Sequence, residues 1–527
     1  MREFNINGLC VPNDHYMVDL SQRVHEIDEI LVAKGKYFTI NRARQYGKTT
    51  TLGIMERYLR DRYIIISISF EGFDSSIFED TSSFINAFKF ACETQLKRYT
   101  VNQPLIEDWI ASPDADNMQT LSARITKLVN GCDRPVILMV DEVDKSSDNQ
   151  LFLNFIGMLR DKYLTRSKYG DDEHAATFKS VILAGVYDIK NLKLKIRPEE
   201  KHTYNSPWNI AAPFDLDMSF SVDEIAGMLN EYETDHGTGM DIQSIANEIR
   251  RQTNGYPFLV SLICKTIDEQ LNREWTISSI DTAVYKIIKK TNILFDDIIK
   301  NIENREDFRN LIERILVKGE SVPFVHSDMV IDLGVTFGIL CEIGGKVSIS
   351  NQIFERYIYE HLVSRLRTRN QLPMDTMEPS FYIHNGHLDI EMVLQRFSAF
   401  LHAERRARDS AFIEQNARLV FLAFVYTIIN GTGKYHVESE TRNNTRMDVI
   451  IDYLRDEFII ELKIWRGTTL EQEAYDQLTG YLDAKGKQKG YLLVFCSNKV
   501  KQPERGKWID HNGYKIYEVI VPFLEEA

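Results

Sequence analysis

Residues 37–50 read YFTINRARQYGKTT, and this stretch decides how the N-terminal part of the chain folds. Tyr37–Asn41 favours a short strand, and a helical pattern follows the Gly47-Lys48-Thr49 that ends the loop. A strand, a tight loop and a helix in this order direct backbone N–H groups and the positive end of a helix toward one point. The stretch therefore predicts a loop that binds phosphate groups.

The loop departs from the usual P-loop spacing, GxxxxGK[ST], at Arg42, which stands where the first glycine is expected. Lys48 is expected to reach the β- and γ-phosphates of a nucleotide, and Thr49 to place its hydroxyl on Mg²⁺. The remaining nucleotide contacts are predicted for Arg44, Gln45, Tyr46, Gly47 and Thr50. A bare Gly-Lys-Thr is also compatible with an ordinary helix N-terminus, so a second stretch is needed.

That second stretch is residues 136–142, VILMVDE, an apolar run that ends in Asp141 and Glu142. Such runs are typical of strands buried on both faces of a parallel sheet. Ligands bind at the C-terminal ends of such strands. Asp141 is expected to hold Mg²⁺ through water, and Glu142 to orient the attacking water. The alternative is a core strand that continues into an exposed acidic turn.

Arg42–Thr49 resembles the R-x-R-x-[FY]-G-K-[ST] loop of prokaryotic AAA-ATPase-like proteins, in which the first glycine is also commonly absent. Asn254–Leu259, NGYPFL, resembles the G-x-P-x-L segment that opens a lid helix near the base in related ATPases. Proline in the first turn of an ordinary helix is the alternative for that segment. The resemblance covers roughly residues 5–370 and implies ATP and Mg²⁺ as cofactors.

The arginine that would stabilise the transferred phosphate is harder to place. Arg160 and Arg166 are candidates, with surface arginines as the alternative. Asp188 stands where such ATPases carry a γ-phosphate sensor. An ATPase without an arginine finger in its own chain often borrows one from a neighbour, so a homo-oligomer is one expectation.

Residues 447–465 contain a second candidate site. Met447–Leu454 and Phe458–Trp465 read as the strands of a hairpin with a polar turn at residues 455–457. In this register Asp448 lies opposite Glu461, and strand alternation puts Lys463 on the same face as Glu461. Two carboxylates and an ammonium suit a metal ion and a cation that acts on a phosphodiester. A surface cross-strand ion pair is the alternative.

The D-x(n)-E-x-K spacing resembles the PD-(D/E)XK nuclease superfamily, although Met447 stands where the name of that superfamily has proline. Glu414, on the preceding helical pattern, matches an acid that contributes to the metal site in the superfamily. Gln477 matches the A-x-x-Q-[LI]-x-x-Y helix of many members. The resemblance implies a nuclease that uses Mg²⁺ or Mn²⁺, with DNA as the expected substrate.

The pattern predicts an α/β multidomain protein. Its parts are a P-loop NTPase domain with a parallel sheet and a helical lid (1–285), a winged-helix-like segment (286–365), a linker (366–388) and a restriction-endonuclease-like α/β domain (389–527). The other predicted strands are Tyr63–Phe70, Val136–Val140, Ser180–Ala184, two short runs around Gly344-Gly345, Tyr491–Cys496 and Lys515–Val521.

Composition limits the partners. The net charge of −14 excludes nucleic-acid binding through bulk positive charge but not through a local groove. Candidate groove residues are Arg442, Arg446, Lys463, Arg466, Lys485, Lys487 and Lys489, with a mixed-charge surface as the alternative. Six cysteines without a CxxC pair argue against a disulfide framework. The longest apolar run is too short to span a bilayer and no signal peptide is recognised, so a cytoplasmic protein without membrane contact is expected.

The leading functional hypothesis is a protein that binds and hydrolyses ATP and carries a metal-dependent nuclease domain acting on DNA. The alternative is an ATP-regulated switch or sensor whose C-terminal domain binds nucleic acid without cutting it.

Overall fold

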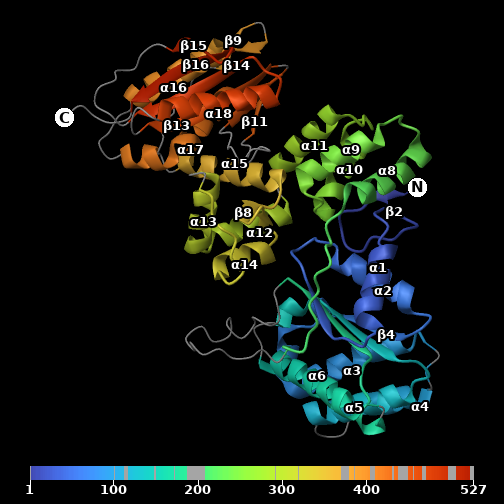
Figure 1. Cartoon of the computed structure of the whole chain (residues 1–527). Coiled ribbons are helices and arrows are strands. Elements are labelled where there is room, and N and C mark those ends of the chain that lie inside the picture. Colours follow the sequence, from blue (N-terminus) through green and yellow to red (C-terminus); the bar gives the residue numbers. More distant parts are fainter. Residues whose placement is uncertain are drawn as a thin grey trace. The chain divides into compact units, whose positions relative to one another are not determined.

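The computed structural model divides into two compact units, which are described separately (Figure 1). The N-terminal unit comprises Met1–Lys290 and Leu333–Ile339, and the C-terminal unit comprises Thr291–Asp332 and Leu340–Ala527. The structure describes residues 2–99, 101, 103–111, 117–146, 150–170, 172–186, 208–290, 292–317, 320–368, 379–384, 386–403, 410–429, 433–436, 449–454, 456–465, 470–496 and 506–522.

The centre of the N-terminal unit is a four-stranded parallel sheet in the order β3-β6-β5-β4. Its strands are β3 (Phe38–Asn41), β4 (Ile64–Ser69), β5 (Val136–Asp141) and β6 (Ser180–Gly185). All four strands were predicted from the sequence, and so was their parallel arrangement. The strand order places β6 between β3, which leads into the phosphate loop, and β5, which ends in Asp141.

Helices cover both faces of this sheet. Successive residues of each strand point to opposite sides, so each strand contributes side chains to two separate cores. Ile64, Ile66 and Leu138 belong to the core under one set of helices: α3 (Thr81–Leu96), α4 (Gln103–Ile110), α5 (Met118–Gly131) and α6 (Gln150–Tyr169). Ile65 and Ile137 belong to the other core, under α1 (Ser21–Ile27), η1 (Asp28–Val32) and α2 (Lys48–Leu59). This double burial explains the apolar runs at residues 64–66, 136–140 and 181–184.

Four further helices, called the lid helices below, follow the sheet in the N-terminal unit. They are α8 (Val222–His236), α9 (Ile242–Thr253), α10 (Pro257–Gln270) and α11 (Ile277–Lys289). Two short parallel strands, β1 (Glu3–Phe4) and β2 (His15–Tyr16), were not predicted. The rings of Phe4 and Tyr16 pack against the ring of Tyr232 of α8, and their centroids lie 5.2 and 5.1 Å from its centroid, respectively. The start of the chain therefore packs against the lid helices.

The C-terminal unit begins with the predicted helical segment and its hairpin. Its elements are α12 (Ile293–Glu303), α13 (Glu306–Leu316), β7 (Leu340–Ile343), β8 (Lys346–Ile349) and α15 (Gln352–Thr368). The helix α14 (Met329–Thr336) begins in this unit and ends in the N-terminal one. The two strands pair across Gly344-Gly345, as predicted. The predicted linker contains η7 (Pro379–Tyr382), β9 (Ile383–His384) and the pairing strand β10 (His387–Leu388).

A six-stranded mixed sheet forms the rest of the C-terminal unit, in the order β11-β12-β13-β14-β16-β15. Its strands are β11 (Gly433–His436), β12 (Val449–Tyr453), β13 (Asp456–Trp465), β14 (Lys489–Cys496), β15 (Lys507–His511) and β16 (Tyr514–Pro522). The edge strands β11 and β15 were not predicted. They are short and contain few apolar residues, so the sequence carries only a weak strand pattern there.

Helices lie on both faces of this sheet as well. The helix α18 (Leu470–Ala484) packs on the face that carries Ile459 and Leu492. On the other face, Phe397 of α16 (Ile390–Ala403) contacts Phe495 of β14 and Phe424 of α17 (Ser410–Ile429). Within the described ranges, no helix has the length and apolar character needed to cross a membrane.

Gly255 provides a test of how closely the chain packs between the sheet and the lid helices. Its φ is +72°, and a Cβ added there would lie 2.2 Å from the carbonyl oxygen of Phe220. We expect Gly255→Ala to lower the free energy of unfolding by about 4 kcal/mol or more, because backbone must move. Gly237, with φ +59° and open space around it, is the matched control. Gly237→Ala should cost only about 1–2 kcal/mol in urea denaturation, from backbone strain alone. Equal losses in the two variants would contradict the close approach.

Candidate functional site

The phosphate loop joins the C-terminal end of β3 to the first residue of α2. Gly47 is the N-cap of α2 and has φ +79°, a conformation that residues with a Cβ rarely adopt. The turn at Gly47 lets the helix start directly after the loop, with the free N–H groups of its first turn beside the loop residues. The strand, loop and helix therefore follow one another as predicted.

Lys48 is buried, with 6% of its surface exposed. Its ammonium donates hydrogen bonds to the carbonyl oxygens of Arg42 at 2.9 Å and Ala43 at 3.0 Å. Burial lowers the pKa of Lys48, while the nearby carboxylates of Glu142, Asp144 and Asp141 act in the opposite direction. The loop thus holds a cation in a confined place next to three acids.

Thr49 and Asp141 connect the two halves of the predicted site. The Thr49 hydroxyl donates to Oδ2 of Asp141 at 2.7 Å, although the residues are 92 positions apart. The other carboxylate oxygen of Asp141 accepts from the backbone N–H of Glu142 at 2.9 Å. A hydroxyl and a carboxylate at this distance are hard oxygen donors of the kind that Mg²⁺ prefers. The residues present therefore fit a Mg²⁺ ion.

Glu142 has a left-handed backbone, with φ +54°, directly after β5. Burial raises the pKa of its carboxyl above the ordinary value, and Asp141 adds to this effect, while Lys48 opposes it. A non-glycine residue in this conformation costs free energy, and such residues cluster at functional sites. Glu142 thus combines backbone strain with a perturbed carboxyl beside the buried lysine.

In the C-terminal unit, the pairing of β12 with β13 follows the predicted register. Val449 pairs with Ile460, and Tyr453 pairs with Asp456. The position of the turn was predicted wrongly, because Asp456 and Glu457 are paired strand residues. Leu454, which follows Tyr453, has a left-handed backbone. The turn is therefore shorter than expected, but its centre is unchanged and the register is the same.

Glu461, Lys463 and Gln477 come together on the face of the sheet under α18. Glu461 is fully buried, with 0% of its surface exposed. The Lys463 ammonium lies 2.9 Å from Oε1 of Glu461 and donates to Oε1 of Gln477 at 2.6 Å. The lysine therefore connects the strand to the helix. Asp448 and the side chain of Glu414 lie outside the described residues.

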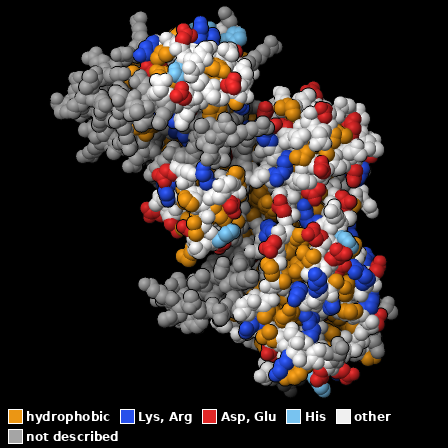
Figure 2. Space-filling view, viewed as in Figure 1, with side chains coloured by type: hydrophobic (Ala, Val, Ile, Leu, Met, Phe, Trp, Pro, Cys, Tyr) orange, Lys and Arg blue, Asp and Glu red, His pale blue; other side chains and the backbone are white. Residues whose placement is uncertain are grey.

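The described residues contain no group of three or more His, Cys, Asp or Glu side chains suited to a metal ion. The predicted metal set of the C-terminal site includes Asp448, which lies outside the described residues. On the face drawn in Figure 2, acidic and basic side chains are interspersed over the described part of the C-terminal unit. Of the predicted groove residues, Lys487 lies 3.7 Å from Glu457, and Arg442, Arg446 and Arg466 lie outside the described residues.

A family model described as the AAA-like domain matches residues 11–360, which is more than half of the chain. The chain belongs to the AAA-like domain family. No match was found among the curated proteins. The matched region contains the phosphate loop, the sheet, the lid helices and the hairpin β7–β8. The predicted resemblance to AAA-ATPase-like proteins is thereby confirmed at the level of the family.

Among solved structures, this AAA-like chain is similar to the Walker-type ATPase PABY2304 of Pyrococcus abyssi, with 12% identity, a TM-score of 0.46, and coverage of 67% of this chain and 99% of that one. It is also similar to the Aeropyrum pernix ORC2 protein in its ADPNP–ADP complexes (10% identity, TM-score 0.38, 70% and 98% coverage). A third is the Aeropyrum pernix ORC1 protein in complex with DNA (13%, 0.30, 66% and 94%). The family assignment rests on the family match alone.

The other predicted residues of the AAA-like loop are held by distant segments. The carbonyl of Arg44 accepts from the Tyr256 hydroxyl, and the ring of Tyr46 meets that of Tyr256 at 4.7 Å. Gln45 has a left-handed backbone with φ +56°. The Thr50 hydroxyl accepts from the N–H of Cys10 at 3.3 Å. The lid motif around Tyr256 was predicted to lie near the nucleotide, whereas no sequence pattern marked the segment at Cys10.

Arg166 is a candidate arginine finger by sequence, and the structure contradicts this role at the phosphate loop of the same chain. Its guanidinium donates to the carbonyls of Gly35, Phe178 and Lys179. These residues precede β3 and β6, so they lie at the N-terminal edge of the parallel sheet, opposite the edge where Asp141 ends β5. Arg166 is not an exposed surface arginine either, because it is partly buried over Tyr37 and Tyr163. Arg160 lies on α6 and stays untested, and Asp188 lies outside the described residues.

If Arg166 is structural, its removal must cost stability. We expect Arg166→Ala to lower the free energy of unfolding by about 2–4 kcal/mol, because bonds from a charged donor to several carbonyls are lost. Lys168, an exposed neighbour over the ring of Tyr169, is the control, and Lys168→Ala should change stability by less than about 0.5 kcal/mol. Urea denaturation followed by tryptophan fluorescence measures both. An Arg166→Ala variant as stable as its parent would contradict the structural role.

Proposed function

We propose that the AAA-like domain binds ATP together with Mg²⁺ at the phosphate loop and hydrolyses it. The single observation that carries the proposal is the 2.7 Å hydrogen bond between Thr49 and Asp141. This bond brings the end of the phosphate loop and the C-terminal end of β5 together beside the buried Lys48. A chance Gly-Lys-Thr at a helix start has no reason to meet an acid 92 residues away.

Each side chain has a role that its surroundings support. Lys48 is placed to exchange its two carbonyl partners for phosphate oxygens. Thr49 and Asp141 would hold Mg²⁺, which neutralises charge on the phosphates when it is bound. Glu142, next to Asp141 and within the field of Lys48, would orient the attacking water and accept its proton. Any arginine finger, and any homo-oligomer that supplies one, stays a prediction.

Two substitutions separate binding from turnover. Lys48→Ala should weaken ATP binding by about two orders of magnitude, since a charge-assisted contact worth about 3 kcal/mol is lost. Glu142→Gln should keep the affinity while phosphate release slows by about 10²–10⁴-fold. The exposed Lys34 is the control, and Lys34→Ala should match the parent in both assays. Calorimetry with Mg-ATP and a phosphate-release assay give the two readouts. Hydrolysis at the parental rate by both variants would show that the site is misplaced.

A second candidate function is favoured by the cluster of Glu461, Lys463 and Gln477. We propose that the C-terminal domain is a metal-dependent phosphodiesterase that acts on DNA. A fully buried carboxylate with a lysine two residues further along the strand is the arrangement that the resemblance to the PD-(D/E)XK superfamily implies. The pairing of Asp448 with Glu461 would continue the register of β12 and β13, and it stays a prediction. Mg²⁺ or Mn²⁺ would polarise the phosphodiester when bound there.

Cleavage of DNA tests this candidate. Asp448→Ala and Glu461→Gln should each abolish cleavage of plasmid, linear or single-stranded DNA in Mg²⁺ or Mn²⁺, because both residues would hold the metal. Lys463→Ala should slow cleavage by about 10²–10³-fold, as expected for the loss of a charge-stabilising group. The controls are Asp452→Ala and Asp456→Ala, which should reduce cleavage much less. Asp452 pairs with Glu457 and Asp456 pairs with Tyr453, so neither lies opposite Glu461.

The outcome also decides between cutting and binding. Equal losses at Asp448 and Asp456 would contradict the assignment of the cluster. If the parent retains DNA in Ca²⁺ and leaves it uncut in Mg²⁺ and Mn²⁺, the result favours the alternative in which the C-terminal domain binds nucleic acid without cutting it. That result would leave the ATPase proposal unaffected, because the two sites lie in separate compact units.

A further inference from the structure

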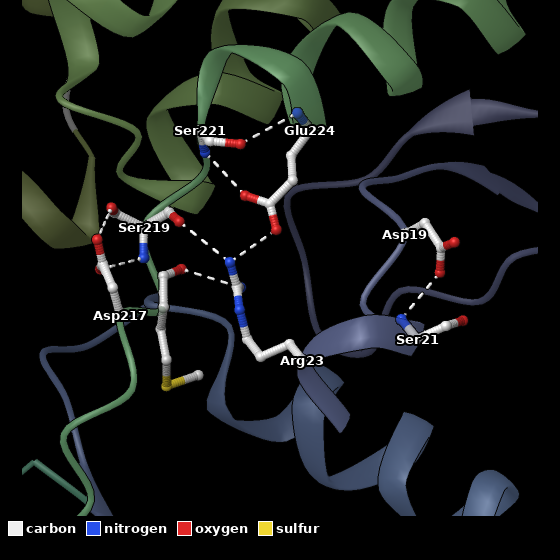
Figure 3. A network of polar contacts seen from close by, with 8 residues as sticks. Asp19, Ser21, Arg23, Asp217, Ser219, Ser221 and Glu224 are labelled. Atoms are coloured by element: carbon white, nitrogen blue, oxygen red, sulfur yellow. Dashed lines mark hydrogen bonds and ion pairs between the residues drawn. The ribbon is translucent and has the colours of Figure 1, made fainter. Parts of the chain in front are cut away.

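Two arginines hold residues 214–219, which precede the lid helices and are called the connector here. Arg23 on α1 donates to the carbonyls of Met218 at 3.4 Å and Ser219 at 3.2 Å, and forms an ion pair with Glu224 at 2.8 Å (Figure 3). Glu224 belongs to the capping box that starts α8, so Arg23 fixes the end of the connector to the first lid helix.

Arg42 holds the beginning of the connector. Its guanidinium donates to the carbonyls of Leu216 at 2.7 Å and Phe214 at 3.4 Å, and lies 5.4 Å from the centre of the Phe214 ring. Burial lowers the pKa of Arg42, although an arginine remains charged. A partly buried guanidinium is costly unless its donors are satisfied, and the carbonyls of Asn41, Phe214 and Leu216 satisfy them. The connector and Arg42 therefore depend on each other.

Arg42 differs from Arg23 because it belongs to the phosphate loop. It occupies the position of the first glycine in the usual loop, where there is no side chain that could reach another segment. Its own carbonyl oxygen accepts from the Lys48 ammonium at 2.9 Å. One residue thus contacts the phosphate-binding lysine with its backbone and the connector with its side chain.

The next two loop residues also contact segments outside the sheet. A Cβ added at Gly338 would lie 2.7 Å from Cβ of Ala43, so the chain after α14 lies directly against the loop. The carbonyl of Arg44 accepts from Tyr256, which precedes α10. Three consecutive residues therefore touch three separate segments. A change in the loop backbone cannot occur without moving at least one of them, because these contacts are closely packed.

We infer that Arg42 is a positioning residue that transmits occupancy of the phosphate site to the connector and the lid helices. The inference rests on the ATP binding proposed above. To contact phosphate oxygens, Lys48 has to release the carbonyls of Arg42 and Ala43, and the peptide groups of these residues then lose their cationic partner. Because the Arg42 side chain is anchored on Phe214 and Leu216, the connector follows the rearrangement of the loop.

Hydrogen–deuterium exchange of the full chain, with and without Mg²⁺ and the non-hydrolysable analogue AMP-PNP, tests this role. In the parent, the rate of amide exchange in the connector and at the start of α8 should differ by about tenfold between the samples with and without the analogue. Arg42→Ala should still bind the analogue within about threefold of the parental affinity but lose that difference. Arg42→Lys keeps a cation of similar length and should restore part of it, which a purely structural role does not predict.

Arg23→Ala is the matched control, because it removes two connector carbonyl bonds without altering the loop. It should raise exchange of the connector in all conditions while keeping the nucleotide-dependent difference. A full difference in Arg42→Ala, or its equal loss in Arg23→Ala, would overturn the inference. Should Arg42→Ala fail to fold, Arg42→Gln, which keeps a donor without the charge, carries the same comparison. A parent that does not bind AMP-PNP would instead overturn the proposed function, and the inference with it.

Discussion

The hydrogen bond from the Thr49 hydroxyl to the Asp141 carboxylate is the contact on which the N-terminal site depends. It forms because β3 and β5 run parallel in one sheet, so the segments after both strands leave the sheet at the same edge. The buried Lys48 and the left-handed backbone of Glu142 lie at that same edge. Without the parallel order of the strands, the loop would be an ordinary helix N-terminus.

Much of this arrangement could be predicted from local sequence. Strands buried on both faces favour apolar residues at successive positions, so β4, β5 and β6 are visible as the apolar runs 64–66, 136–140 and 181–184. The register of β12 and β13 was also predictable, because a hairpin with a short turn fixes all its pairs once its centre is known. The turn residues themselves were placed wrongly. Asp456 and Glu457 are polar, but they belong to a strand whose other residues supply the burial.

The remaining features depend on contacts between residues far apart in the chain. Nothing in the residues around Cys10 or Gly338 indicates that they meet the phosphate loop, because their roles arise from position and not from side-chain chemistry. Arg166 illustrates the opposite error, in which suitable chemistry lies at the wrong edge of the sheet. In the C-terminal unit, Glu461 and Lys463 were predicted to lie together because they are two residues apart in one strand. Gln477 lies on a helix further along the chain, and only its match to a family pattern indicated that it would come close to Lys463.

The hydrogen bonds of Lys48 to the carbonyls of its own loop have a consequence for selectivity. The loop acts as an internal competitor, since an anion gains only the difference between its own contacts and those that the ammonium gives up. A small anion such as free phosphate offers charge and little else, so it gains least from this exchange. A ligand that makes further contacts away from Lys48 keeps their full free energy, because those contacts displace no hydrogen bond of the lysine. The internal hydrogen bonds of Lys48 therefore disfavour the binding of small anions, which compete with any nucleotide for this site.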